Sequence, residues 1–212
     1  MTRRRTRGAG GLGALVAGAL AAPPADVRAL QTATSLEVAA VAAYGALRDL
    51  AVVRGNPALV RFVQTTMFQH DEHRQAFQSQ TRALGGQPQT APHPALASVV
   101  DQATPTLTTP LDVVTLAETL ETVAAHTYLA DLAQLEDGAS RRLVASVMGV
   151  ECRHAATLRV FKALLQGAPD LVRFPLGADA ARLPPGSLVA GVPEPTEPTT
   201  GAVAPDSAAL PQ

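Results

Sequence analysis

The segment LEVAAVAAYGAL at residues 36–47 decides the fold of this chain, because its pattern occurs a second time as LETVAAHTYLADL at residues 120–132. In both segments a glutamate precedes a tyrosine by seven residues, and these two tyrosines are the only ones in the chain. Apolar residues surround each glutamate at helical spacing. The repeat therefore predicts two equivalent helices, each with one carboxylate that faces inward.

Glu37 carries the strongest single signal, since it is the only charged residue between Arg28 and Arg48. A carboxylate buried among alanine and valine without a partner is strongly unfavourable or becomes protonated. The alternative is an apolar stripe narrow enough to leave Glu37 in water. A cation is the simplest group that would compensate a buried Glu37.

Each half of the chain also contains a pair of ligating residues three positions apart. His70 and His73 lie in MFQHDEHRQAF, and Glu151 and His154 lie in MGVECRHAATL. Because positions i and i+3 share a face of a helix, each pair directs two side chains the same way. Two single glutamates and two such pairs are the kind of ligand set that holds a dinuclear metal site in a four-helix bundle.

The offset between the halves identifies the acid that matches Glu37. Glu121 follows it by 84 residues, close to the 81 that separate the two ligand pairs, whereas Glu118 aligns with a threonine. We therefore assign Glu118 as a neighbour of the ligands or a group at the rim of the site. Tyr44 and Tyr128 lie two turns along from the glutamates, where they either hydrogen-bond the ligands of the opposite half or pack in the core.

Periodicity and helix-breaking residues predict four long helices. They span about residues 26–53, 57–84, 110–136 and 139–166. The first and last connections are very short, whereas residues 85–109 form a long connection that can hold a short helix at 93–103. This order predicts an all-α, ferritin-like four-helix bundle with one long crossover between its second and third helices.

The composition excludes several classes of function. The 17 basic and 18 acidic side chains give no argument for nucleic acid as a partner. Aromatic residues make up 3% of the chain and tryptophan is missing, which favours packed helices over a β-sandwich. The single cysteine, Cys152, excludes an internal disulfide framework and a cysteine-rich zinc site.

Residues 1–22 have the pattern of a signal peptide. Arginines at positions 3, 4, 5 and 7 precede an uncharged Gly/Ala/Leu stretch and the A-x-A sequence Ala19–Ala21. The stretch is too short to span a bilayer, so the mature chain is expected to have no transmembrane span. We expect export to the periplasm, cell envelope or exterior, with the twin-arginine and general secretory routes both open.

The rest of the chain divides into three parts. Residues 23–168 are predicted to form the bundle, and residues 169–192 an extension that lies against it. Residues 193–212 are rich in Pro, Thr and Ala and have little to bury, which predicts a disordered tail.

These residues resemble the ferritin-like superfamily, in particular bacterial exported proteins with a ferritin-like domain. The resemblance covers about residues 26–167, and in the family each half supplies one Glu from its first helix and Glu-x-x-His from its second. It implies that the following residues are metal ligands: Glu37, His73, Glu121, Glu151 and His154.

His70 stands where the family has a bridging glutamate. Three carboxylates and three imidazoles form a softer site than four carboxylates do, with one negative charge fewer, and an imidazole does not bridge metals as a carboxylate does. A dinuclear iron centre bridged by Glu151 or a water-derived oxygen stays open. A mononuclear site, or one with zinc, manganese or mixed metals, also stays open.

The expected function is redox handling of iron, O₂ or peroxide at a site of two iron ions, with manganese or zinc as alternatives. Such a protein would act as a ferroxidase or a peroxide-reducing oxidoreductase. The alternative is a structural or metal-binding bundle with a degenerate site and no turnover. The sequence identifies metal ions as partners and leaves a homo-oligomer open.

Overall fold

Polar residues just outside the helices determine where three of the four long helices begin. The side chain of Asn56 accepts hydrogen bonds from the backbone amides of Ala58 and Leu59 at the start of α3. Thr109 forms a capping box with Asp112 at the start of α5, and Asp137 accepts from the amide of Ser140 at the start of α6. These caps satisfy amides that have no partner within the helix.

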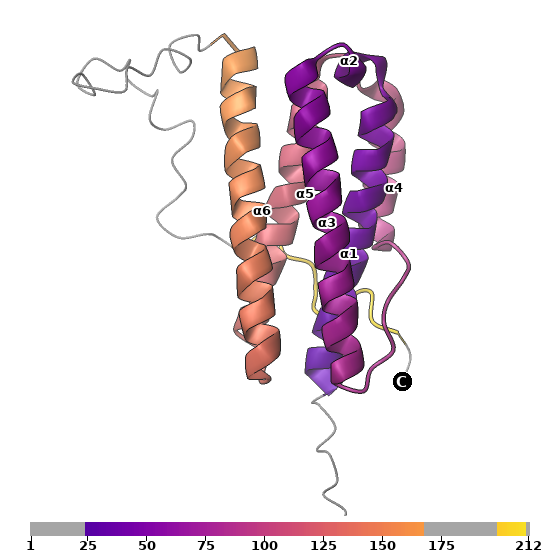
Figure 1. Cartoon of the computed structure of the whole chain (residues 1–212), viewed down its shortest axis with the longest axis vertical. Helices are drawn as coiled ribbons and strands as arrows, with labels where there is room; N and C mark the ends of the chain where they lie inside the picture. The colour runs from indigo at the N-terminus through magenta and orange to yellow at the C-terminus, as the bar shows by residue number, and fades with distance from the viewer. Residues whose placement is uncertain (1–23, 168–198, 211–212) are drawn as a thin grey trace, which may run out of the picture.

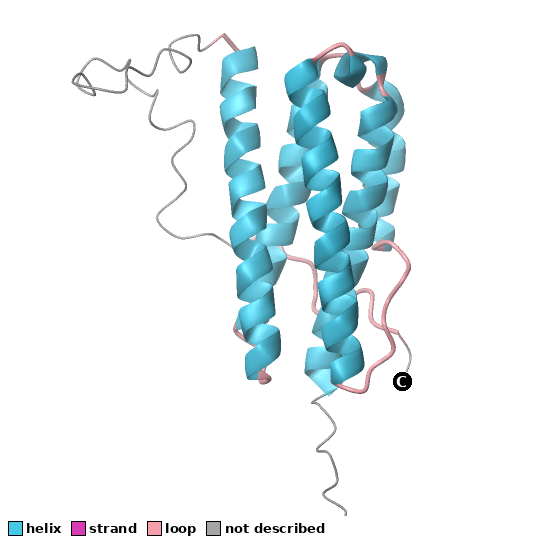
Figure 2. Ribbon diagram, viewed as in Figure 1, coloured by secondary structure: helices cyan, strands magenta, loops and turns pink. Residues whose placement is uncertain are grey.

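The computed structural model describes residues 24–167 and 199–210. In this part of the chain all regular structure is helical, with no strand (Figure 2). The elements are α1 (Pro24–Asp49), α2 (Ala51–Arg54), α3 (Pro57–Ala83), α4 (Pro94–Ala103), the 3₁₀ helix η1 (Thr104–Thr106), α5 (Pro110–Leu132) and α6 (Gly138–Leu165). The predicted signal peptide and the extension at 169–192 lie outside the described residues. Within them, no helix is long and apolar enough to cross a membrane.

The four long helices form two hairpins that lie side by side (Figure 1). α1 packs mainly against α3, and α5 packs mainly against α6. Between α3 and α5 the chain crosses over through α4, which contacts α1. The predicted all-α, ferritin-like bundle with one long crossover is confirmed.

Two helix boundaries differ from the sequence prediction. The first helix was expected to reach Val53, but it ends at Asp49 because Leu50 has an extended backbone (φ −68°, ψ 138°), and the short α2 follows. The third long helix of the prediction, α5, ends at Leu132 rather than just before Asp137. The carboxylate of Asp26 accepts hydrogen bonds from the backbone amides of Glu136 and Asp137, at 3.0 and 2.6 Å. These bonds hold the connection between α5 and α6 to the start of α1.

Residues 199–210 lie against the bundle, which differs from the disorder that their composition predicts. The amide of Val203 donates to Thr127 on α5 at 3.0 Å, and the amide of Ala208 donates to Thr32 on α1 at 3.3 Å. Thr32 and Thr127 are both 0% exposed. Buried polar groups on the two helices therefore supply the partners for this segment, a specific recognition that composition does not reveal.

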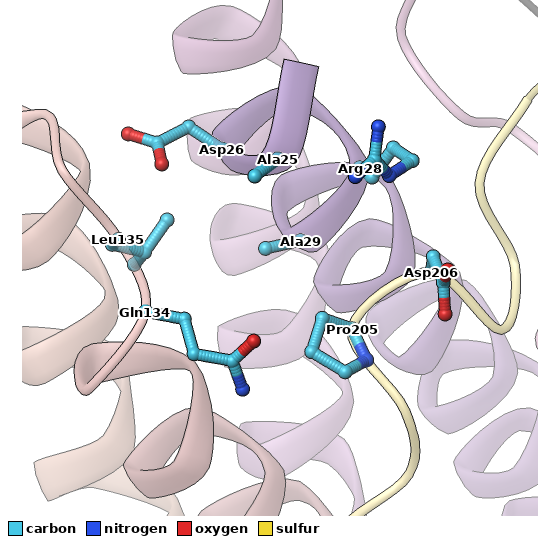
Figure 3. Close-up of a pocket in the computed structure, with 8 residues that line it drawn as sticks. All are labelled: Ala25, Asp26, Arg28, Ala29, Gln134, Leu135, Pro205 and Asp206. Atoms are coloured by element: carbon cyan, nitrogen blue, oxygen red, sulfur yellow. The ribbon is translucent and has the colours of Figure 1, made fainter. Parts of the chain in front are cut away.

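A cavity of about 240 Å³ lies where this segment meets the start of α1 and the α5–α6 connection (Figure 3). Its lining includes Arg28, Gln134 and Asp206. The carboxylate of Asp26 points away from the other residues at this cavity, toward the connection whose amides it binds. The C-terminal segment therefore forms one wall of the cavity, and none of the predicted metal ligands lines it.

Candidate metal centre

Six side chains that could hold a metal ion meet in the middle of the bundle, from four helices. α1 and α5 contribute one glutamate each, α3 contributes two histidines, and α6 contributes a glutamate and a histidine. They are Glu37, His70, His73, Glu121, Glu151 and His154. The three glutamates and His70 are at most 1% exposed, so this centre is closed to bulk water on most sides. The structure thus brings together all six residues that the sequence predicts as ligands.

The contacts define two overlapping groups of four residues. Within each group, one nitrogen or carboxylate oxygen per residue lies within 4.8 Å of all the others. The first group is Glu37, His70, His73 and Glu151, and the second is His70, Glu121, Glu151 and His154. Both groups share His70 and Glu151, so two ion positions would be adjacent and joined through these two residues.

His70 occupies the middle of the centre. Its Nδ1 lies 2.7 Å from Oε2 of Glu37, and its Nε2 lies 3.2 Å from Oε1 of Glu121. The ring of Tyr44 stacks on it, with centroids 5.3 Å apart and planes inclined by 28°. The imidazole is therefore fixed between the two single glutamates of the repeat.

His73 and Glu151 supply a test of whether the residues fit a metal ion. Nδ1 of His73 and Oε1 of Glu151 lie 2.8 Å apart, within ion-pair distance, but both atoms are buried and, among the described residues, neither makes a hydrogen bond of acceptable geometry. Buried polar atoms are normally satisfied, and each exception calls for an explanation. An ion that accepts a lone pair from both atoms would satisfy them, so the donor set fits a metal.

His154 is oriented by a residue that the sequence interpretation missed. Its Nδ1 faces the centre, 3.2 Å from carboxylate oxygens of both Glu121 and Glu151. Its Nε2 lies 2.7 Å from Oε1 of Gln69 on α3. The amide oxygen can only accept, so Nε2 donates and the lone pair of Nδ1 is left for a metal. The only sign of this role in the sequence is that Gln69 directly precedes His70, and a half-buried glutamine has no distinctive sequence pattern.

The two tyrosines connect the halves of the repeat. Tyr44 donates a hydrogen bond to Glu121, and Tyr128 donates one to Glu37. Both tyrosines are 0% exposed. Burial, followed by the nearby carboxylates, raises the pKa of each tyrosine well above its usual value, so both hydroxyls stay protonated as donors.

The histidines of the centre hold protons tightly when no ion is bound. Burial opposes a charged ring, but the facing carboxylates outweigh it and raise the pKa of His73 and of His154 to about 9. The pKa of His70 is also well above its usual value, because Glu121, Glu151 and Glu37 surround it. In the metal-free centre the protonated histidines therefore compensate the negative charge of the glutamates.

The three glutamates respond differently to their surroundings. Burial raises the pKa of each, but His70 more than offsets this for Glu37 and for Glu121, whose pKa values are lowered. The pKa of Glu151 is raised, since burial and its two like-charged neighbours outweigh His70. Glu151 is the carboxylate that both groups of ligands share, and a shared position between two ions would favour its ionised form.

Glu118 lies outside the centre and has other partners. Its carboxylate is 2.7 Å from Nζ of Lys162 and 3.4 Å from Nε of Arg159, both on α6. The sequence left two places open for Glu118, beside the ligands or at the rim of the site. In the structure its carboxylate pairs with basic side chains of α6, one turn before Glu121 along α5. It links α5 to α6.

A small cavity adjoins the centre on the side of α1 and α5. It measures about 10 Å³, and Leu96 of α4 borders it together with Glu37, His70 and Glu121. This volume is close to that needed for a single water molecule. The remaining lining is largely aliphatic, and it leaves room for a very small molecule beside the carboxylates.

Comparison with known proteins identifies the class of this molecule. The family model described as a ferritin-like domain matches residues 25–163, which include all six residues of the centre. The chain belongs to the ferritin-like domain family. Comparison with curated proteins and with solved structures gave no match.

Proposed function

We propose that this protein binds two metal ions at the six-residue centre and uses them for redox handling of iron, O₂ or peroxide. The observation that supports this most directly is the buried contact of His73 Nδ1 with Glu151 Oε1, which lie 2.8 Å apart without the geometry of a hydrogen bond. Iron is the ion we propose, with manganese or zinc as alternatives, because imidazole and carboxylate ligands suit all three. Glu37 and His73 would hold one ion, Glu121 and His154 the other.

An iron pair would supply the ability to exchange electrons with an oxidant. The protein's own contribution would be to orient the ligands and exclude water. Tyr44 and Tyr128 fix the carboxylates of Glu121 and Glu37 by hydrogen bonds. The small aliphatic cavity bordered by Leu96 would admit O₂ or peroxide but little else. We also propose export, on the basis of the signal-like pattern of residues 1–22.

A second candidate function is a metal-binding or structural bundle without turnover. It is favoured by the pairing of every carboxylate of the centre with a histidine, as in the 2.7 Å contact of His70 with Glu37. Three protonated histidines can compensate three glutamates without any ion. Such a bundle would keep the fold and bind an ion weakly, if at all.

Anaerobic titration with Fe²⁺, followed by addition of O₂ or peroxide, distinguishes the two. The redox function predicts about two equivalents of bound iron and an absorbance change faster than that of free iron. Less than one equivalent, or oxidation no faster than free iron, would exclude it. Glu121→Gln should lose iron, whereas Glu118→Gln provides a matched control, because Glu118 is on the same helix but pairs with Lys162.

A further inference from the structure

His70 differs from the other two histidines of the centre in the placement of its ring nitrogens. His154 directs only Nδ1 to the glutamates and turns Nε2 to Gln69. His70 directs Nδ1 to Glu37, at 2.7 Å, and Nε2 to Glu121, at 3.2 Å. Its two nitrogens therefore face carboxylates that belong to opposite halves of the repeat.

We propose that His70 bridges the two metal ions as an imidazolate, with Nδ1 on the ion held by Glu37 and His73 and Nε2 on the ion held by Glu121 and His154. This inference rests on the proposed metal-binding function. The ligand pair of the second half has Glu151 at the position that aligns with His70. The proposal gives His70 the bridging role that a glutamate at this position would have.

The two overlapping groups of ligands support the bridge. His70 belongs to both groups, and each group is compact enough for one ion. A histidine that bound a single ion would leave its second nitrogen directed at a glutamate of the other group. The other histidines have no such double placement, since His73 contacts the glutamates only through Nδ1.

Charge supports the same arrangement. Two divalent ions carry four positive charges, and the three glutamates supply three negative charges. With neutral imidazoles one positive charge would remain at a centre whose glutamates are at most 1% exposed, which is unfavourable. An imidazolate at His70 supplies the fourth negative charge that the missing glutamate would have given.

The proton balance of the step is simple. A bridging imidazolate carries hydrogen on neither nitrogen. Each ion forms a bond to one nitrogen, and any proton that this nitrogen carries in the metal-free protein leaves to solvent. No oxidant or reductant takes part, so the bridge can form with a redox-inactive ion such as Zn²⁺, a common ion at imidazole sites.

The distance between the two ions tests the proposal. Crystals of the full chain grown with Zn²⁺ should show two anomalous peaks on either side of His70. The peaks should be about 6 Å apart, because the distance between the two ring nitrogens adds to two metal–nitrogen bonds of about 2.0 Å each. Two ions about 3.5–4 Å apart would overturn the bridge, because that spacing is typical of centres bridged by carboxylate or oxygen. A single ion would also overturn it.

Two variants of His70 complete the test. His70→Glu restores a carboxylate and should retain two Zn²⁺ but shorten their separation to about 3.5–4 Å. His70→Gln has no second nitrogen to ionise and should bind at most one Zn²⁺. His93→Gln, at a buried histidine outside the centre, should bind two as the unmodified protein does, and thermal melts check that each variant is folded. If His70→Gln still binds two Zn²⁺, the bridge is refuted while the metal-binding function stands; if the unmodified protein binds none, both fail.

Discussion

The hydroxyl of Tyr44 donates a hydrogen bond to the carboxylate of Glu121, although the two residues lie 77 positions apart in different halves of the chain. Tyr128 donates to Glu37 in the same way. Each half of the repeat therefore orients the single carboxylate of the other half. The two hydrogen bonds form only when the hairpins are packed together, so they couple the fold to the geometry of the centre.

Tyr44→Phe should weaken metal binding while it leaves the ring that stacks on His70 in place. The carboxylate of Glu121 would lose a buried donor, and loss of such a supporting hydrogen bond typically lowers metal affinity by about 10–100-fold. Competition titration with a chelator measures the Kd. Tyr128→Phe is the matched variant for Glu37, and an unchanged Kd in both would show that the hydroxyls do not support the ligands.

Removal of metal should give a protein whose stability falls as the pH rises above about 6.5. The pKa of His73 and of His154 is about 9 in the folded protein, above the ordinary value of 6.5. Their contribution is therefore fully present below pH 6.5 and is lost as the pH rises through about 9. Urea denaturation of metal-free protein between pH 6 and 10 measures this loss. Metal affinity should show the opposite trend, since an ion binds the deprotonated rings.

Gln69→Ala should weaken metal binding by about 10-fold, because it removes the acceptor that holds Nε2 of His154. The ring would then be free to rotate or to carry its hydrogen on Nδ1. Gln75→Ala is a suitable control on the same helix, since Gln75 is exposed and its amide contacts Asp71 instead. Equal affinities in the two variants would argue against an orienting role for Gln69.

Asp131→Asn should stabilise the protein at pH 8. Asp131 is 0% exposed, neither of its carboxylate oxygens has a hydrogen-bond partner in the part of the chain that the structure describes, and burial raises its pKa to about 7. Because the pKa of Asp131 is raised on folding, the contribution of this residue to stability is fully present below its unfolded pKa of 3.8 and is lost as the pH rises through about 7. The gain should be about 2–4 kcal/mol at pH 8 and close to zero at pH 4. A similar gain at both pH values would show that the charge of Asp131 is not its cause.

Truncation after residue 198 should lower the melting temperature by a few degrees and leave the helical content unchanged. It removes the hydrogen bonds to Thr32 and Thr127, which would become exposed. Circular dichroism records both quantities. Thr127→Val, which removes the acceptor for Val203 together with the hydroxyl's own hydrogen bond to the Val123 carbonyl, should cause a smaller decrease. A melting temperature unaffected by truncation would mean that the segment contributes no net stability.

The sequence predicted the bundle because the signals for its helices are local. Caps such as Asn56 and Thr109 act within one turn, and the repeat of Glu37 as Glu121 gives the pairing of the halves. The interruption at Leu50 was missed, since leucine is common in helices. The docking of residues 199–210 was missed because it depends on single hydrogen bonds to buried threonines.

The candidate centre was predictable to the extent that it follows helical spacing. The six ligating residues share faces of their helices, so their convergence follows from the repeat. Contacts between helices do not follow from spacing. For this reason the sequence could not decide between a place beside the ligands and one at the rim for Glu118. It also did not indicate the contact of Gln69 with His154, or that both nitrogens of His70 would face carboxylates.

The division of the bundle into two hairpins has a consequence for metal release. α1 and α3 supply Glu37, His70 and His73, whereas α5 and α6 supply Glu121, Glu151 and His154. Each group of four ligands draws on both hairpins, so neither ion could keep its full coordination once the hairpins separate. The rate at which a chelator removes the ions would then report how often the hairpins part, and an occupied centre would make the two unfold as a single unit.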